Sequence, residues 1–217
     1  MTPTFRFAAL AALALCAASP ARADWTGTMK LHIEPAEPHA PGDQQGVISG
    51  KGARLRFEMD QTAMGKVAAI VDLKAQKSTM VMVDRRVYMT MDLSQNPSGR
   101  AAPVHIKCEV DDGATCLLKN GFAKTGVETV NGKKSDKWEK DSVQESGKKV
   151  HETLWIPQGV KGFALVRQVT QMPERTATLD VLDLKETSLA DSLFTPPADY
   201  TDVSGKMGPG GPGGRPQ

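Results

Sequence analysis

The chain has 217 residues, of which 24% are charged, and its 27 Lys and Arg nearly balance its 25 Asp and Glu. It contains no run of five like charges and no basic stripe interleaved with aromatic side chains. Nucleic-acid binding therefore has no electrostatic support, and neither does a special attraction to anionic membrane surfaces.

The first 23 residues predict a cleaved secretory signal peptide. Arg6 and the amino terminus form a short basic region, residues 7–15 are apolar, and residues 21–23 read Ala-Arg-Ala, which is typical of a cleavage site. The apolar run is too short to cross a bilayer as a permanent helix. We therefore expect cleavage near Ala23 and a periplasmic or secreted mature chain without a transmembrane segment, which retains 25 basic and 25 acidic residues.

The three cysteines divide into one in the leader and two in the mature chain. Cys16 ends the sequence Leu-Ala-Leu-Cys, which resembles a lipobox, so a lipoprotein anchored through Cys16 is the minor alternative. Cys108 and Cys116 remain in an oxidising compartment, and their spacing is not the C-x-x-C of redox and metal pairs. We expect a disulfide between them, worth about 2–3 kcal/mol because the closed loop is short.

Alternation of apolar and polar residues dominates the chain after the leader. Turn residues such as Asn131-Gly132 separate the alternating runs. This pattern predicts a mainly β protein, built as a single curved antiparallel sheet or incomplete β-barrel of about ten strands. The expected strands cover residues 25–33, 54–60, 66–73, 79–83, 86–93, 126–130, 135–144, 149–156, 163–171 and 175–185.

One or two short helices are expected within this β domain. Residues 113–119 are suited to two helical turns, with Asp112 as the N-cap and Asn120-Gly121 as the stop. The alternative is a tight hairpin at residues 111–113 with a cross-strand disulfide. A second short turn of helix is expected at residues 188–193.

The mature chain is expected to form one domain over residues 24–203. Chains of this length suit a single all-β barrel or sandwich. The remaining residues, 204–217, are rich in Gly and Pro and cannot bury enough apolar surface to become ordered, so we expect a disordered tail.

Four methionines, Met80, Met82, Met89 and Met91, occur as two M-x-M runs. A turn near Asp84-Arg85 would form a hairpin in which the period-two geometry of strands places all four on one face. Such a soft face suits a core filler, the lining of a site for flexible apolar ligands, or a platform for Cu(I). The copper hypothesis is weakened because the hairpin contains no histidine.

These alternatives lead to three functional hypotheses. In the first, the protein is an envelope protein that binds an apolar or lipidic ligand in the concavity of the sheet. In the second, the same face is a completed core, and the protein is a structural or interaction module with another envelope protein as its partner. In the third, the methionines bind Cu(I). The residues expected to line the ligand site are Leu55, Phe57, Met59, Ile70, Met80, Met82, Val87, Met89 and Met91.

The sequence is poor in catalytic motifs. His151-Glu152 begins like H-E-x-x-H, but Trp155 occupies the position of the second histidine. No G-x-S-x-G motif occurs, and the other histidines, His32, His39 and His105, are scattered without a partner motif. We therefore expect a non-enzymatic protein with no catalytic residue, no cofactor and no metal site.

The second half of the chain resembles a known family. The resemblance lies in the Thr-Val-Asn-Gly turn at residues 129–132, in the following strand around Trp138, and in the terminal sequence Asp-Ser-Leu-Phe-Thr-Pro-Pro-Ala-Asp-Tyr at residues 191–200. These features resemble the DUF4412 family, which is similar in architecture to periplasmic lipoprotein carriers of the LolA/LolB type. The resemblance implies a strongly curved, incomplete β-barrel whose hydrophobic concave face is plugged by helices or loops. Carriers of that shape hold the acyl chains of lipoproteins in this cavity, but no carrier residue matches this sequence position by position, so the identity of the cargo does not carry over.

Overall fold

The computed structural model describes residues 24–35, 43–62, 65–95, 106–109, 112–144 and 147–205. The signal peptide and lipobox expected over residues 1–23 lie outside this part of the chain, and so does most of the tail expected over residues 204–217. No helix within the described ranges is long and apolar enough to cross a membrane.

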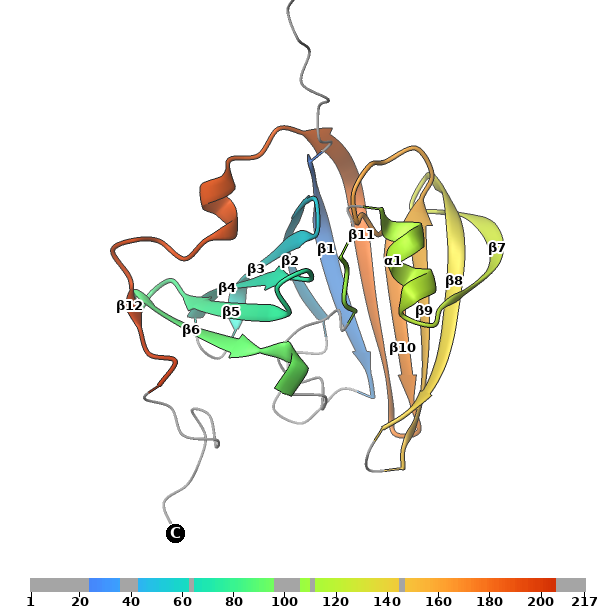
Figure 1. The fold of residues 1–217 in the computed structure, drawn as a ribbon, viewed down its shortest axis with the longest axis horizontal. Coiled ribbons are helices and arrows are strands. Elements are labelled where there is room, and N and C mark those ends of the chain that lie inside the picture. The colour runs from blue at the N-terminus through green and yellow to red at the C-terminus, as the bar shows by residue number, and fades with distance from the viewer. Residues whose placement is uncertain are drawn as a thin grey trace, which may run out of the picture.

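All twelve described strands belong to one sheet (Figure 1). Its spatial order is β12-β6-β5-β4-β3-β2-β1-β11-β10-β9-β8-β7, and neighbours are antiparallel except β12, which runs parallel to β6. The expectation of a single curved sheet that forms an incomplete barrel is therefore confirmed, with twelve described strands where about ten were expected. The strands are β1 (Asp24–Glu34), β2 (Asp43–Lys51), β3 (Arg54–Thr62), β4 (Gly65–Asp72), β5 (Lys77–Met82), β6 (Val87–Asp92), β7 (Ala123–Val130), β8 (Lys133–Val143), β9 (Lys149–Pro157), β10 (Arg167–Met172), β11 (Arg175–Thr187) and β12 (Thr201–Asp202).

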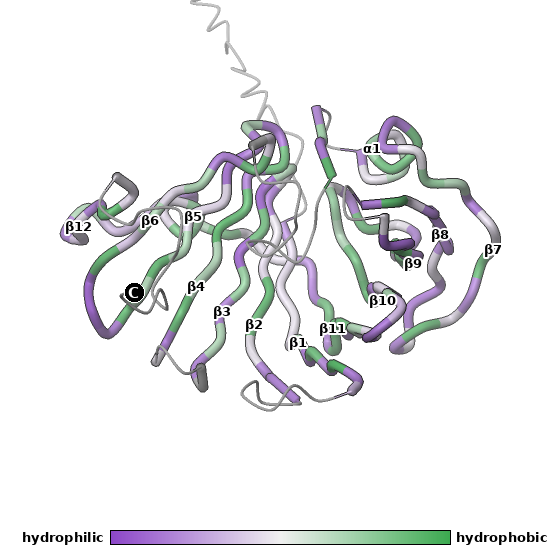
Figure 2. The backbone as a smooth tube through the Cα atoms, turned by 90° about the horizontal axis from the view of Figure 1, so that it is seen from below, coloured by the Kyte–Doolittle hydropathy of each residue, from purple (hydrophilic) through white to green (hydrophobic). Residues whose placement is uncertain are grey.

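The sheet curves into an arc, with the helix α1 (Gly113–Lys119) at its open side (Figure 2). We call the face of the sheet that carries α1 and the main apolar core the inner face, and the opposite face the outer face. The main core joins residues from both halves of the arc, including Trp25, Phe57, Leu117 and Leu154. This burial of the inner face is what makes the curved sheet a stable half-barrel.

The strand β2 was not among the expected strands, because its two glycines look like turn residues in the sequence. Both are required by close packing. A Cβ atom at Gly46 would lie 1.9 Å from the carbonyl oxygen of Glu58, and one at Gly50 would lie 2.3 Å from the ring of Trp25. Glycine therefore marks close approach within this sheet and not the end of a strand.

The expected helix at residues 113–119 is present with these bounds and with the expected cap. The Asp112 carboxylate accepts a hydrogen bond of 2.9 Å from the backbone N–H of Thr115. Hydrogen bonds from the Thr115 hydroxyl and backbone N–H hold the pKa of Asp112 below its usual value. The expected disulfide between Cys108 and Cys116 is also present, in the helical arrangement and not in the hairpin alternative.

A strand was expected over residues 163–171, but the strand β10 begins only at Arg167. Phe163, Ala164, Leu165 and Val166 are each at most 1% exposed and form a buried link outside the strands. Their continuous apolar character resembles that of a buried strand, and periodicity alone does not separate the two.

Residues 188–205 form a segment that we call the C-terminal strap. It contains the 3₁₀ helix η2 (Asp191–Phe194), where a short turn of helix was expected at residues 188–193, and it includes β12. The ring of Phe194 packs on Ala68, Ile70 and Val81 of the outer face and forms a second, smaller apolar cluster. A further 3₁₀ helix, η1 (Leu93–Gln95), follows β6.

Polar contacts attach the strap at its beginning. The Asp24 side chain is 3% exposed; its Oδ2 accepts a hydrogen bond of 2.9 Å from the backbone N–H of Leu189 and lies 3.3 Å from Lys51 Nζ. The same Lys51 ammonium donates to the carbonyl oxygen of Leu189 at 2.6 Å. A largely buried ion pair therefore binds both backbone groups of one strap residue.

Cationic side chains hold the rest of the strap. The Arg54 guanidinium lies 2.7 Å from the Asp191 carboxylate and 5.3 Å from the centre of the Phe194 ring. Arg86 pairs with Asp199 and lies 5.8 Å from the centre of the Tyr200 ring. The terminal sequence motif at residues 191–200 thus serves to dock the strap on the outer face.

Candidate functional site

The methionine hairpin forms as expected. The turn over residues 83–86 joins β5 to β6, and Arg86 within it adopts a positive φ of 51°. Met80 pairs with Met89, while Met82 pairs with Val87 and Ser78 pairs with Met91. Because cross-strand partners share a face and side chains alternate along each strand, all four methionines lie on one face of the sheet.

Strand register places these methionines on the inner face. Met80 is paired with Ala69, which is paired with Phe57, and Phe57 is paired with Ile48. Ala69, Phe57 and Ile48 belong to the main core. The hairpin therefore extends the wall of the concavity to the edge of the half-barrel.

The expected lining residues differ strongly in exposure along this wall. Leu55 is 0% exposed, Phe57 2% and Met82 1%, so these three are fully buried. Met59 is partly buried and packs against the main core. Four residues remain partly exposed and belong to neither apolar cluster of the described chain. We call this group the methionine rim: Met80, Val87, Met89 and Met91.

Ile70 lies on the wrong face for the expected lining. It pairs with Arg56 and Thr79 and packs under Phe194 in the outer cluster. The error arises because β4 is apolar on both faces, so that alternation does not reveal which of its residues point inward. The inward residues of β4 are Val67, Ala69 and Val71, and the register with β5 places Val67 beside Met82 and Ala69 beside Met80.

The rim and the wall beside it are uncharged. Among the described inward side chains of β3, β4, β5 and β6, none is ionisable. All of them are apolar except that of Ser78. Ser78 is completely buried. A ligand on this wall would therefore meet apolar and thioether groups, with no group placed to neutralise a charge.

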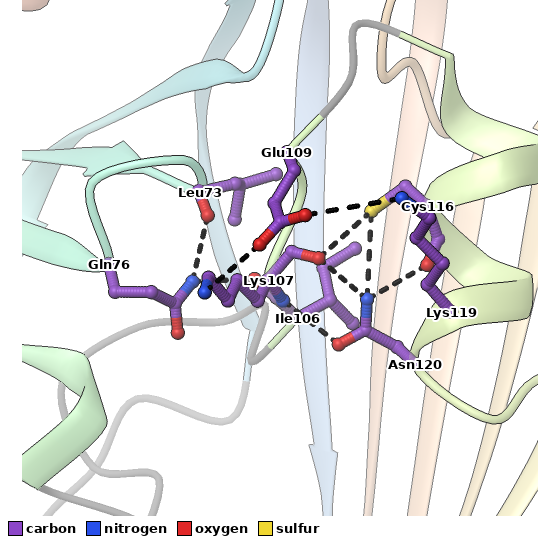
Figure 3. A network of polar contacts seen from close by, with 8 residues as sticks. All are labelled: Leu73, Gln76, Ile106, Lys107, Glu109, Cys116, Lys119 and Asn120. Carbon is purple, nitrogen blue, oxygen red and sulfur yellow. Dashed lines mark hydrogen bonds and ion pairs between the residues drawn. The ribbon is translucent and has the colours of Figure 1, made fainter.

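Elsewhere the concavity is crossed by residues 106–109, which connect the two halves of the arc (Figure 3). Gln76 Nε2 donates to the carbonyl oxygen of Ile106 at 3.0 Å, and the N–H of Cys108 donates to the carbonyl oxygen of Leu73 at 3.1 Å. On the α1 side, the Asn120 amide pairs with both backbone groups of Lys107, at 2.7 and 2.9 Å. The disulfide makes the link to α1 covalent.

Two buried indole N–H groups lack an acceptor. The Nε1 atoms of Trp25 and Trp138 have no hydrogen-bond partner within the described chain, although the two residues are only 1% and 3% exposed. Both rings belong to the main core. Trp155 belongs to the same cluster but differs in hydrogen bonding, because its Nε1 donates to Glu128 at 2.9 Å.

The described histidines lie outside the concavity and contact carboxylates. Hydrogen bonding to Asp43, and then to Glu34, raises the pKa of His32. His151 Nδ1 lies 2.8 Å from Asp141 and its Nε2 lies 3.3 Å from the Thr153 hydroxyl, but Thr153 is only 5% exposed, which leaves a substrate little access to this hydroxyl. His39 and His105 lie outside the described residues.

The described residues do not form a metal site of the usual carboxylate, imidazole or thiolate ligands. No three His, Cys, Asp or Glu side chains there are grouped so that they could hold an ion. The thioethers of the rim are a separate donor class, and the strand register places those of Met80 and Met89 on directly opposed residues.

No family model matches the sequence, and no curated protein matches it either. Solved structures with a similar course of the chain include a LolA superfamily protein of Nitrosomonas europaea, with 14% identity and a TM-score of 0.43 over 81% of this chain and 91% of that one. The lipoprotein LppX of Mycobacterium tuberculosis has 14% identity and a TM-score of 0.41 over 76% and 89%. A chain of the Pseudomonas aeruginosa MucA/MucB complex has 10% identity and a TM-score of 0.42 over 83% and 58%. The likeness is confined to the coarse arrangement of the strands.

Proposed function

We propose that the protein is an exported, non-enzymatic envelope protein that binds an apolar or lipidic ligand on the inner face of its half-barrel. The observation that carries this proposal is the methionine rim, where an uncharged wall remains partly exposed beside a fully buried core. Large apolar surfaces are normally buried unless they contact something else. Methionine is unbranched and flexible, so a wall made of it repacks around ligands of variable shape.

The proposal includes the export of the protein. Residues 1–23 would be removed as a signal peptide near Ala23, with anchoring through Cys16 as the minor alternative, and the mature protein would act in the periplasm. Residues 24–203 would then be a LolA-like β domain of the DUF4412 family, with residues 204–217 as a disordered tail.

The main alternative is a structural or protein-interaction module with a filled core and another envelope protein as its partner. The complete burial of Leu55, Phe57 and Met82 favours this alternative, since these side chains behave as ordinary core residues. It differs from the main proposal in one respect. Under it, the methionine rim would contact a folded protein surface and not a small apolar molecule.

Binding of Cu(I) by the methionines is the lesser alternative. The described part of the hairpin contains no histidine or cysteine to complete a thioether site, and Cys108 and Cys116 are joined in the disulfide. If copper is the ligand, Met80→Leu with Met82→Leu should abolish retention of Cu(I) while the fold is kept. A wild-type protein that retains no Cu(I) would end this alternative.

Extraction of the natively purified protein with organic solvent tests the main proposal. We expect mass spectrometry of the extract to show a co-purified lipid, and a fluorescent acyl-chain probe to bind the emptied protein. The double variant Met89→Gln, Met91→Gln should bind the probe roughly tenfold more weakly or worse, because each amide would be desolvated without a partner. Val143→Gln is the matched control, since Val143 is 66% exposed and lies outside the rim.

The control variant should bind the probe like the wild type, and thermal unfolding should show that all variants are folded. An empty extract together with no binding of the probe would overturn the proposal. Normal probe binding by the rim variant would place the ligand elsewhere on the protein.

A further inference from the structure

We propose that oxidation of Met80, Met89 and Met91 to sulfoxides switches off apolar binding at the inner face, so that the site responds to peroxide. This inference rests on the proposed function and concerns the regulation of the same site. It depends on three features of the structure, which are the clustering of the three thioethers, their exposure, and the lack of exposed polar side chains among the described inward residues beside them.

The strand register makes these three residues neighbours. Met80 lies directly opposite Met89, and Met91 lies opposite Ser78, two residues before Met80 on β5. Directly opposed Cβ atoms are about 5 Å apart and diagonal neighbours about 7–8 Å, within reach of long side chains. Sulfoxides at the three positions would therefore change one continuous patch of the wall.

Exposure separates these methionines from Met29 and Met82 on the inner face, and Met59, which is also partly exposed there, differs from them because it packs against the main core. Met80, Met89 and Met91 are partly exposed, whereas Met29 is 2% exposed and Met82 1%. Oxidation of methionine to its sulfoxide is a common oxidative lesion, and a reagent dissolved in water reaches exposed sulfur atoms first. Peroxide would therefore modify the rim before it damages the core, and the fold would survive the modification.

The chemistry balances with hydrogen peroxide as the oxidant. The thioether sulfur attacks one peroxide oxygen, the O–O bond breaks, a sulfur–oxygen bond forms, and the second oxygen leaves as water. The sulfur loses two electrons and the peroxide gains them. Methionine sulfoxide reductases reverse the reaction, one enzyme for each epimer of the sulfoxide, with a dithiol that is oxidised to a disulfide while the sulfoxide oxygen leaves as water.

The surroundings of the rim explain why this modification would matter for binding. A sulfoxide oxygen is a strong hydrogen-bond acceptor, and the inward residues Val67, Ala69 and Met82 beside the rim donate no hydrogen bonds. The only described inward hydroxyl on β5, that of Ser78 opposite Met91, is completely buried. Water would solvate the new oxygens in the free protein. An apolar ligand would have to displace this water without replacing its hydrogen bonds, so it would bind more weakly.

Mild treatment of the mature protein with hydrogen peroxide tests the inference. Peptide mass mapping should show the gain of one oxygen at Met80, Met89 and Met91 before Met29 and Met82 react. We expect titration with the acyl-chain probe to show roughly tenfold weaker binding or worse after oxidation, from the cost of desolvating unpaired polar groups. Treatment with both methionine sulfoxide reductases and their thiol reductant should restore the binding.

Two variants provide controls. The triple variant Met80→Leu, Met89→Leu, Met91→Leu keeps the volume and apolar character of the rim, a type of change that proteins tolerate well. It should bind the probe both before and after peroxide. Met172→Leu replaces a partly exposed methionine at the end of β10, outside the rim, and should leave the response to peroxide unchanged.

The outcomes separate this inference from the function on which it rests. If the untreated wild type does not bind the probe, the proposed function fails. If it binds the probe equally well after the three methionines are fully oxidised, the function stands and the peroxide switch is wrong. If the triple variant also loses binding after peroxide, other groups are responsible and the switch is again wrong.

Discussion

Replacing Trp155 with Phe should destabilise the protein more than replacing Trp138 with Phe, although both rings are buried in adjacent strands. Trp138 is 3% exposed and Trp155 8%. The two indoles differ in hydrogen bonding: Trp155 Nε1 donates to the Glu128 carboxylate at 2.9 Å, whereas Trp138 Nε1 has no acceptor among the described residues. Each substitution removes a similar part of the ring, so the difference in destabilisation between the two variants depends on the hydrogen bonding of the indole N–H.

The size of this difference follows from the surroundings of each ring. A hydrogen bond to a charged group contributes roughly 1.5–3 kcal/mol, and we reduce this to about 1 kcal/mol because the Glu128 side chain is 48% exposed and water can replace the indole. Removing the unpaired N–H of Trp138 instead relieves a desolvation penalty on the order of 1 kcal/mol. The two free energies of unfolding should therefore differ by about 1–2 kcal/mol.

Urea denaturation followed by far-UV circular dichroism measures this difference without relying on tryptophan fluorescence. The Ala variants at each position provide the reference for full loss of the ring and should cost about 3–5 kcal/mol. Similar m-values would show that the variants unfold from comparable native states. Equal destabilisation by the two Phe variants, or a larger effect at Trp138, would refute the assignment of an unpaired indole.

Three further predictions concern other parts of the fold. Because Asp43 raises the pKa of His32, protonated His32 should stabilise the protein fully below its unfolded pKa of about 6.5 and lose this effect as the pH rises through the folded pKa. The variant His32→Gln should remove this pH dependence of the free energy of unfolding near neutrality, and an unchanged pH profile would contradict the prediction. Replacing Cys108 and Cys116 with Ser should lower the free energy of unfolding in urea by about 2–3 kcal/mol, and an unchanged midpoint would show that the disulfide is energetically neutral. Phe194→Ala should cost about 3 kcal/mol and speed hydrogen exchange in the C-terminal strap, whereas unchanged exchange would show that the strap is held without the ring.

Local signals predicted the α1 region well. The Asp112 cap, the Asn120-Gly121 stop and the cysteine spacing all act within a few residues, so the sequence itself contains the interactions that form the helix and its disulfide. The methionine hairpin was predicted for the same reason, since alternation and a short turn are enough to place the four methionines on one common face. The strand β2 was missed because its glycines are required by close contacts with Trp25 and Glu58 on neighbouring strands, and such distant contacts cannot be read from the local sequence.

The sequence alone determined that this is a mainly β chain with one disulfide and four methionines on a common face, and it left a capped helix and a tight hairpin as alternatives beside that disulfide. Only the tertiary structure decided which face that is, that Ile70 points away from it, and that Met82 is buried while Met80, Met89 and Met91 stay partly exposed. The physical reason is the range of the interactions. Alternation and capping act between near neighbours, whereas exposure depends on which distant segments, here α1, residues 106–109 and the C-terminal strap, cover each part of the sheet.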